Sequence, residues 1–252
     1  MKKVFLLLFC TVLLGFTTSC LDSNGDAGRI ITGSANITLN TENEIPMVEN
    51  RDETGSFQMV IYDDNTLSFT ITVNDLLGGD NLTAAHIHAG DPVSTGAPVI
   101  TLVDGTSVSF QGNKATGSIQ LTAAEVTSLL GGDVYVNVHS TDIPSGLVRG
   151  QLDKAVDAAY NVVLSPGNEI PAITGRTDSG IAIIRIVEET VYYKVIVSDL
   201  AGGDAITAGH IHEGEATENG TVFQNLEITD ASQLGVTKTL TLDENKISKL
   251  KE

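Results

Sequence analysis

The stretch DNTLSFTITVNDLLGGDNLTAAHIHAGD, residues 64–91, decides the fold because the chain contains it twice. Its second copy is EETVYYKVIVSDLAGGDAITAGHIHEGE, residues 188–215. A shorter pair precedes it, NEIPMVENRDETG at 43–55 and NEIPAITGRTDSG at 168–180, and LTAAEVTSL at 121–129 aligns with LDENKISKL at 242–250. Repeats of this length are domains in tandem, not units of a solenoid.

The repeat predicts where the domains lie. We expect a first domain over 36–152, a linker over 153–158 and a second domain over 159–252. The first copy continues with LGGDVYVNVHSTDIPSGLVRGQL, residues 130–152, and the second copy contains no equivalent. We therefore expect the second domain to be incomplete at its C-terminal end, either because the sequence is a fragment or because the domain lacks its last strands.

Hydrophobic alternation indicates β-strands in both copies. Residues 66–73 place Leu67, Phe69, Ile71 and Val73 on one face, and residues 191–198 repeat this pattern. Further strand candidates are ANITLN, SFQMVIYD, PVITLVD, KATGSIQL, DVYVNVHS and GLVRGQL. One helix is predicted at 122–130, where Thr122 and Glu125 have capping-box spacing. The pattern predicts an all-β protein of two tandem antiparallel β-sandwiches, of Greek-key or immunoglobulin-like type, with one short helix each.

The N-terminus has the features of an export signal. Lys2 and Lys3 precede an apolar run at 4–16, which is too short for a spanning helix. TTSC at 17–20 resembles the bacterial lipobox, with Thr17 in place of the usual leucine. We expect a lipoprotein signal peptide over 1–19, a lipidated Cys20 and a tether over 20–35, which anchor an exported protein to the bacterial outer membrane or cell surface. The alternative is an ordinary cleaved signal peptide followed by an incidental cysteine.

Charge and cysteine content restrict the partners. The formal net charge is −18, with 14 basic and 32 acidic residues, so nucleic acid and anionic lipid would repel the chain. Contact with a membrane is expected only through the lipid anchor. The only cysteines are Cys10 and Cys20, which leaves none for a disulfide after export and processing.

Four of the five histidines form two His-x-His pairs, His86 with His88 and His210 with His212. Side chains alternate on a strand, so His86 and His88 share one face, and Ala85, Ile87 and Ala89 share the other face toward the core. On the predicted strand at 134–140, His139 shares a face with Tyr135 and Asn137. If these two strands pair, His86, His88 and His139 converge.

Two interpretations of the histidines stay open. The first is structural, since neutral imidazoles can hydrogen-bond carbonyls, hydroxyls or each other. The second is a zinc or copper site, because imidazole suits both ions. In that case His86, His88 and His139 are the ligands, with Asp142 as a fourth ligand or as a hydrogen-bond acceptor behind them. His210 and His212 then form only half of such a site.

An enzyme is not expected. The sequence has no Ser-His-Asp spacing, no cysteine pair and no glycine-rich phosphate loop before a helix, and Ser140 faces away from its neighbour His139 on the predicted strand. Arg51 and Arg176 recur at matching positions beside acidic residues, which indicates structural ion pairs.

Three motifs carry a family resemblance: NEIP, AAHIHAG and the closing VYVNVHSTDIPSGLVRGQL. They resemble the CHRD domain, a module of chordin and of many bacterial envelope proteins. The resemblance covers nearly all of the first copy and most of the second, and it implies tandem immunoglobulin-like β-sandwiches. HIHAGD and HIHEGE are also locally similar to copper–zinc superoxide dismutase, but the further metal ligands and the disulfide of that enzyme are missing, so its activity is not expected.

The sequence thus predicts a lipid-anchored cell-envelope protein with tandem CHRD domains and a non-catalytic binding or structural role. Its partner would be a protein or another envelope component. The alternative is a periplasmic or surface protein that binds copper or zinc.

Overall fold

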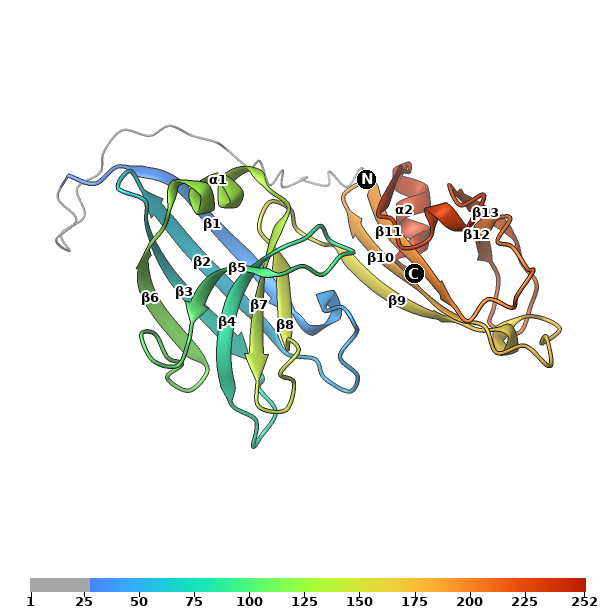
Figure 1. The fold of residues 1–252 in the computed structure, drawn as a ribbon, viewed down its shortest axis with the longest axis horizontal. Helices are drawn as coiled ribbons and strands as arrows, with labels where there is room; N and C mark the ends of the chain where they lie inside the picture. The colour runs from blue at the N-terminus through green and yellow to red at the C-terminus, as the bar shows by residue number, and fades with distance from the viewer. Residues whose placement is uncertain (1–27) are drawn as a thin grey trace, which may run out of the picture.

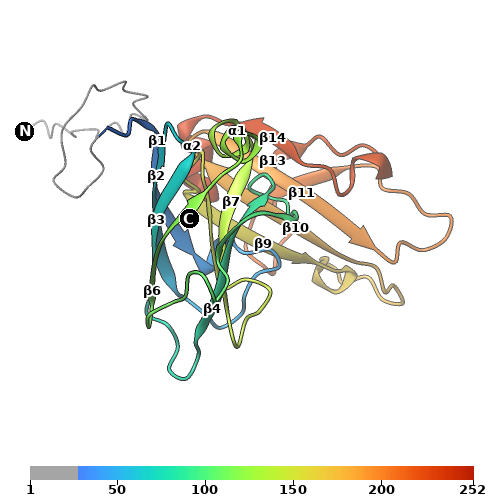
Figure 2. The same ribbon diagram turned by 60° about the vertical axis from the view of Figure 1, so that its left-hand side comes forward.

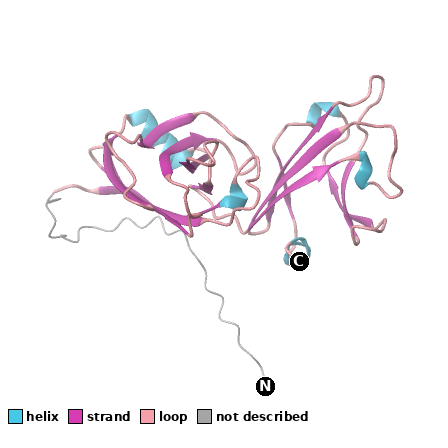
Figure 3. Ribbon diagram, turned by 90° about the horizontal axis from the view of Figure 1, so that it is seen from below, coloured by secondary structure: helices cyan, strands magenta, loops and turns pink. Residues whose placement is uncertain are grey.

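The computed structural model describes residues 28–252 and contains two β-domains in series (Figure 1). All strand pairs in both domains are antiparallel, which confirms the predicted all-β class. Strands and loops make up most of each domain, and the helices are short (Figure 3). The predicted signal peptide and Cys20 lie outside the described residues. No helix within residues 28–252 has the length and apolar character needed to span a membrane.

The first domain contains eight strands and one α-helix. They are β1 Ile31–Asn40, β2 Thr54–Tyr62, β3 Thr66–Asn74, β4 Leu82–Ala89, β5 Pro98–Val103, β6 Lys114–Gln120, α1 Ala123–Gly131, β7 Val134–Ser140 and β8 Val148–Gln151. A 3-10 turn, η1, spans Thr41–Asn43. The predicted tether reached residue 35, whereas β1 begins at Ile31, because residues 31–35 pair with the end of β2.

The strand order is β5-β4-β7-β8-β1-β2-β3-β6. A single residue pair, Asn40 with Arg149, joins β1 to β8, so the strand order divides there into two halves of four strands each. The two halves face each other (Figure 2). Strands β6 and β7 lie beside β3 and β4 and not beside the strands that precede them, as in a Greek key. The predicted sandwich is therefore present in the first domain.

Alternation builds the core between the two halves. Leu67, Phe69, Ile71 and Val73 of β3 are buried on the inner face, as the sequence pattern predicted. They belong to one apolar cluster with Ala85 and Ile87 of β4 and with the valines at 134, 136 and 138 of β7. Helix α1 begins with the predicted capping box, in which Thr122 and Glu125 bond each other's backbone N–H.

The second domain repeats part of this architecture. Its elements are β9 Ala158–Leu164, β10 Ser179–Val187, β11 Thr190–Ser198, β12 Gly209–Glu213, β13 Thr221–Leu226, β14 Lys238–Thr241 and α2 Glu244–Leu250, with 3-10 turns at Pro166–Asn168 (η2) and Ala231–Gln233 (η3). The order β14-β11-β10-β9 corresponds to β6-β3-β2-β1, and the hairpin β12-β13 corresponds to β4-β5. In the described part of this domain, nothing corresponds to β7 and β8.

The domains touch through polar contacts. Arg185 of β10 is fully buried, and its Nη2 donates to the carbonyls of Asn43 (3.2 Å) and Glu44 (3.1 Å) in the first domain. A second contact joins β11 and the segment before β14 to the loop between β4 and β5. The second domain is therefore held on the first at two separate points.

The repeated arginines form the ion pairs that the sequence predicted. Arg51 contacts Glu53 (2.6 Å) and Asp80 (2.7 Å), and all three side chains are buried. Arg176 contacts Asp178 and Asp204 at the surface of the second domain. These arginines tie the segment before the second strand of each copy to the Gly-Gly-Asp turn.

Candidate metal centre

The site lies where β4 and β7 pair in the first domain. In their register Ala84 is opposite His139, and His86 is opposite Asn137. Ala85 and Ile87 are fully buried in the core, so the flanking His86 and His88 point to the outer face. Ala89 was predicted on the core side but is exposed, because it is the last residue of β4 and lies outside the apolar cluster that contains Ala85 and Ile87.

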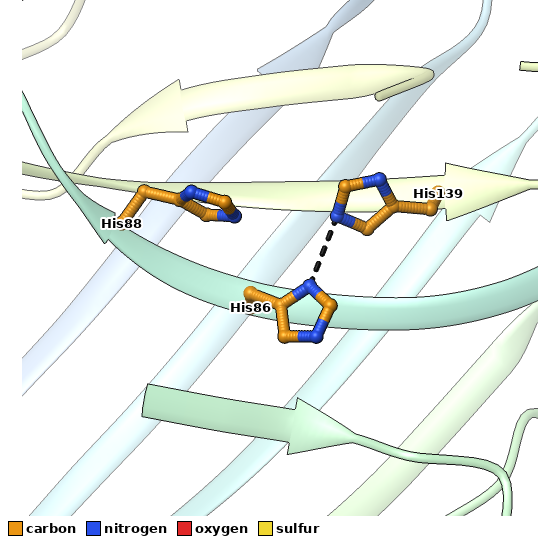
Figure 4. Close-up of side chains that lie close together, drawn as sticks. All are labelled: His86, His88 and His139. Atoms are coloured by element: carbon orange, nitrogen blue, oxygen red, sulfur yellow. Dashed lines mark hydrogen bonds between the residues drawn. The ribbon is translucent and has the colours of Figure 1, made fainter. Parts of the chain in front are cut away.

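Three imidazole rings converge on this face (Figure 4). One nitrogen from each of His86, His88 and His139 lies within 4.8 Å of the other two. The closest pair is His86 Nδ1 and His139 Nε2, at 3.0 Å. The convergence that the sequence made conditional on strand pairing is therefore present.

Backbone carbonyls fix the protonation of two rings. His88 Nδ1 lies 2.9 Å from the Gly96 carbonyl oxygen, and His139 Nδ1 lies 3.0 Å from the Pro144 carbonyl oxygen. A carbonyl oxygen can only accept, so each Nδ1 carries the proton and each Nε2 of the neutral ring has a lone pair, which on His139 accepts from His86 Nδ1. His88 Nε2 is shielded from solvent and has no hydrogen-bond partner among the described residues. A buried acceptor without a donor is unusual. The lone pair of this nitrogen is available to coordinate a metal ion.

Burial keeps two of the rings neutral. Desolvation and the neighbouring His88 lower the pKa of His86. Desolvation, with His86 beside it, lowers the pKa of His139 to about 4. Both rings are consequently neutral at neutral pH, and the neutral imidazole is the form that binds a metal ion.

The His88 ring stacks on Tyr135, which in turn stacks on the guanidinium of Arg149. The rings of His88 and Tyr135 are stacked, with centroids 5.1 Å apart and planes 15° from parallel. The guanidinium of Arg149 lies 3.5 Å from the centroid of Tyr135, and Arg149 is buried. The sequence placed Tyr135 on the correct face but gave it no role, and Arg149 was included only as a letter of the motif VYVNVHSTDIPSGLVRGQL. The alternation of β7 and β8, once the two strands are paired, places Arg149 on the same face as Tyr135 and could have indicated the contact.

Asp142 does not take the role predicted for it. It lies beside Arg51, with Oδ2 3.9 Å from Nη1, and it is not in the histidine cluster. The turn after β7 directs the backbone N–H of Asp142 to Asp80, and the Pro144 carbonyl takes the place behind His139. The prediction failed because the acceptor is a backbone atom, which has no signature in the sequence.

The second His-x-His pair forms half of this arrangement. His210 and His212 have ring centroids 5.8 Å apart, and both side chains are exposed on β12. His212 Nδ1 lies 3.0 Å from the Gly220 carbonyl, as His88 does from Gly96. In residues 28–252 only the first-domain cluster brings three potential ligands together.

The first-domain geometry is close to that of a metal site. With bonds of about 2.0 Å, the nitrogens of a tetrahedral zinc site are about 3.3 Å apart. His86 and His139 already satisfy this separation, and only a small ring movement is needed to bring His88 to it. Histidine ligands commonly donate their second N–H to a carbonyl, as His88 and His139 do here. Three protein ligands leave one coordination position for water or another group.

Comparison with known proteins adds one result. The family model of the CHRD domain matches residues 35–152 and, a second time, residues 160–251. No curated protein and no solved structure matches the chain.

Proposed function

Because this chain belongs to the CHRD domain family, with one copy of the domain in each half, we propose that it is a non-catalytic binding protein of the bacterial cell envelope. Its first domain binds a single zinc or copper ion through His86, His88 and His139. The observation that carries this proposal is the meeting of three nitrogens within 4.8 Å, two of them on rings whose other nitrogen is held by a carbonyl.

The ligand set favours particular ions. Imidazole nitrogens suit zinc and copper, whereas calcium and magnesium require oxygen ligands. Affinity for a nitrogen site rises from zinc to divalent copper, so copper should displace zinc when both are present. In an exported protein without a disulfide, an ion that ties β4 to β7 would also stabilise the first domain.

The envelope location rests on the sequence. Lys2 and Lys3, the apolar run at 4–16 and Cys20 are the features that support it, and all lie outside the described residues. The test is metabolic labelling of cells with a fatty acid. We expect the wild-type chain to be labelled and to fractionate with membranes, and Cys20→Ser to be unlabelled and released.

Titration calorimetry and metal analysis of the mature chain test the metal site. We expect one zinc or copper ion per chain, lost in His86→Ala, His88→Ala and His139→Ala. His210→Ala is the matched control, because it removes one imidazole from the exposed pair in the second domain, and it should keep full binding.

A different result would point to the structural alternative. If the wild-type chain binds neither ion at micromolar concentration, the proposal is wrong. The hydrogen bond between His86 and His139 would then serve to join β4 and β7. Loss of stability in His139→Ala without any bound metal would identify that role.

A further inference from the structure

The loop between β4 and β5, residues 90–97, lies against His88 on the Nδ1 side of its ring. Its Gly96 carbonyl accepts from His88, and its Gly96 N–H donates to the Tyr135 hydroxyl (3.3 Å). Arg149 Nη2 donates to the carbonyls of Asp91 (2.8 Å) and Ser94 (2.9 Å). The loop also packs directly on β4, since a Cβ added at Gly96 would lie 1.9 Å from the Ala89 carbonyl oxygen. Its position therefore determines where the acceptor for His88 lies.

The second domain contacts this same loop. Lys194 Nζ of β11 donates to Ser94 Oγ at 2.5 Å, and the hydroxyls of Ser94 and Thr237 lie 3.0 Å apart. Lys194 and Thr237 are both partly buried. Ser94 is thus held from both sides, through its carbonyl by Arg149 of the first domain and through its hydroxyl by the second domain.

These contacts form a short path from one domain to the metal centre. Ser94 is two residues from Gly96, whose carbonyl selects the protonated nitrogen of His88 and the orientation of its ring. We propose that Lys194 and Thr237 are positioning residues for His88, which act through Ser94 and Gly96. The second CHRD domain then helps to build the site of the first. This inference rests on the proposed metal-binding function.

The coupling works in both directions. If docking of the second domain strengthens metal binding, metal binding must strengthen docking by the same factor. Without Lys194 and Thr237, the loop keeps its bonds to Arg149 and Tyr135 but loses its anchor in the second domain. It can then shift relative to β4, and the His88 ring can rotate or move its proton to Nε2. The free lone pair would then no longer face His86 and His139.

The test compares the mature chain with the double variant Lys194→Ala/Thr237→Val. We expect zinc affinity to fall about threefold to tenfold, which lies within the range of effects seen for residues that act through others. Lys246→Ala is the matched control, since the Lys246 side chain bonds Gln224 and lies over the Phe223 ring, both within its own domain. The zinc affinity of this variant should not change. The conservative Lys194→Arg, made alone, should retain most of the affinity because it keeps a donor for Ser94.

A second readout uses the metal-free chain, in which the His88 Nδ1 proton is observed by NMR. We expect its exchange with solvent to be slow in the wild type and in Lys246→Ala, and faster in the double variant. Unchanged proton exchange together with unchanged zinc affinity overturns the inference, even if the wild type binds metal. If the wild type binds no metal, the proposed function fails, and the proton exchange alone decides whether the second domain positions His88.

Discussion

His86 Nδ1 lies 3.0 Å from His139 Nε2, across two strands whose histidines are 53 residues apart in the sequence. Because the Pro144 carbonyl holds the proton of His139 on Nδ1, the proton in this bond belongs to His86. A metal ion at the centre would take the place of that proton, and His86 would carry its hydrogen on Nε2 instead. Metal-free and metal-bound forms thus differ by a tautomer change in one ring.

Metal binding should raise the stability of the first domain. An ion that binds only the folded state at about 100 times its Kd adds about 2.7 kcal/mol to the free energy of unfolding. Thermal denaturation with zinc, and again after a chelator, measures the effect. The increase should be absent in His139→Ala and present in His210→Ala. Equal shifts in both variants would show that the ion binds elsewhere.

The junction between the two halves of the first sandwich depends on Gly150. A Cβ at this position would lie 2.4 Å from the Thr38 carbonyl oxygen and 2.7 Å from Leu39 Cδ2. We expect Gly150→Ala to lower the free energy of unfolding by about 1–3 kcal/mol, as overpacking does. Urea denaturation measures this loss. Gly78→Ala is the control, because no atom lies within 4 Å of its added Cβ. If Gly150→Ala and Gly78→Ala are equally stable, the close approach of Thr38 and Leu39 is not the reason for glycine at position 150.

Alternation along the strands was enough to predict the core face of β3 and the outward direction of His86 and His88. The convergence of His139 needed the order of the strands, because β4 pairs with β7 across the intervening β5, β6 and α1. The carbonyls of Gly96 and Pro144 could not be predicted, since every residue has a carbonyl and only the folded loop selects one. The domain contact did have a signal that went unused, namely Arg185 within the apolar run IAIIRIV.

The buried Arg185 should matter more for stability than the exposed Arg176. Replacing Arg185 with alanine leaves the carbonyls of Asn43 and Glu44 without their donor and leaves a cavity at the domain contact. We expect a loss of about 3 kcal/mol in the free energy of unfolding. Arg176→Ala removes ion pairs at the surface and should cost less than about 1 kcal/mol. Chemical denaturation of both variants measures the difference, and similar losses would contradict the role given to the domain contact.

The metal-free first domain should lose stability on mild acidification because of His139. Its pKa is lowered to about 4 in the folded chain, while an unfolded histidine titrates near 6.5. Between these values the unfolded chain binds a proton that the folded chain does not, so unfolding becomes more favourable as pH falls from about 6.5 to 4. Above pH 6.5 the contribution is fully present.

Thermal denaturation at several pH values, in the presence of a chelator, tests this dependence on His139. His139→Gln should weaken the loss of melting temperature between pH 6.5 and 4, because glutamine does not titrate. His212→Gln, which changes an exposed histidine in the second domain, should keep the slope of the wild type. If His139→Gln retains the full slope, another group is responsible for the acid sensitivity, and the neutral state assigned to His139 in the metal centre is wrong.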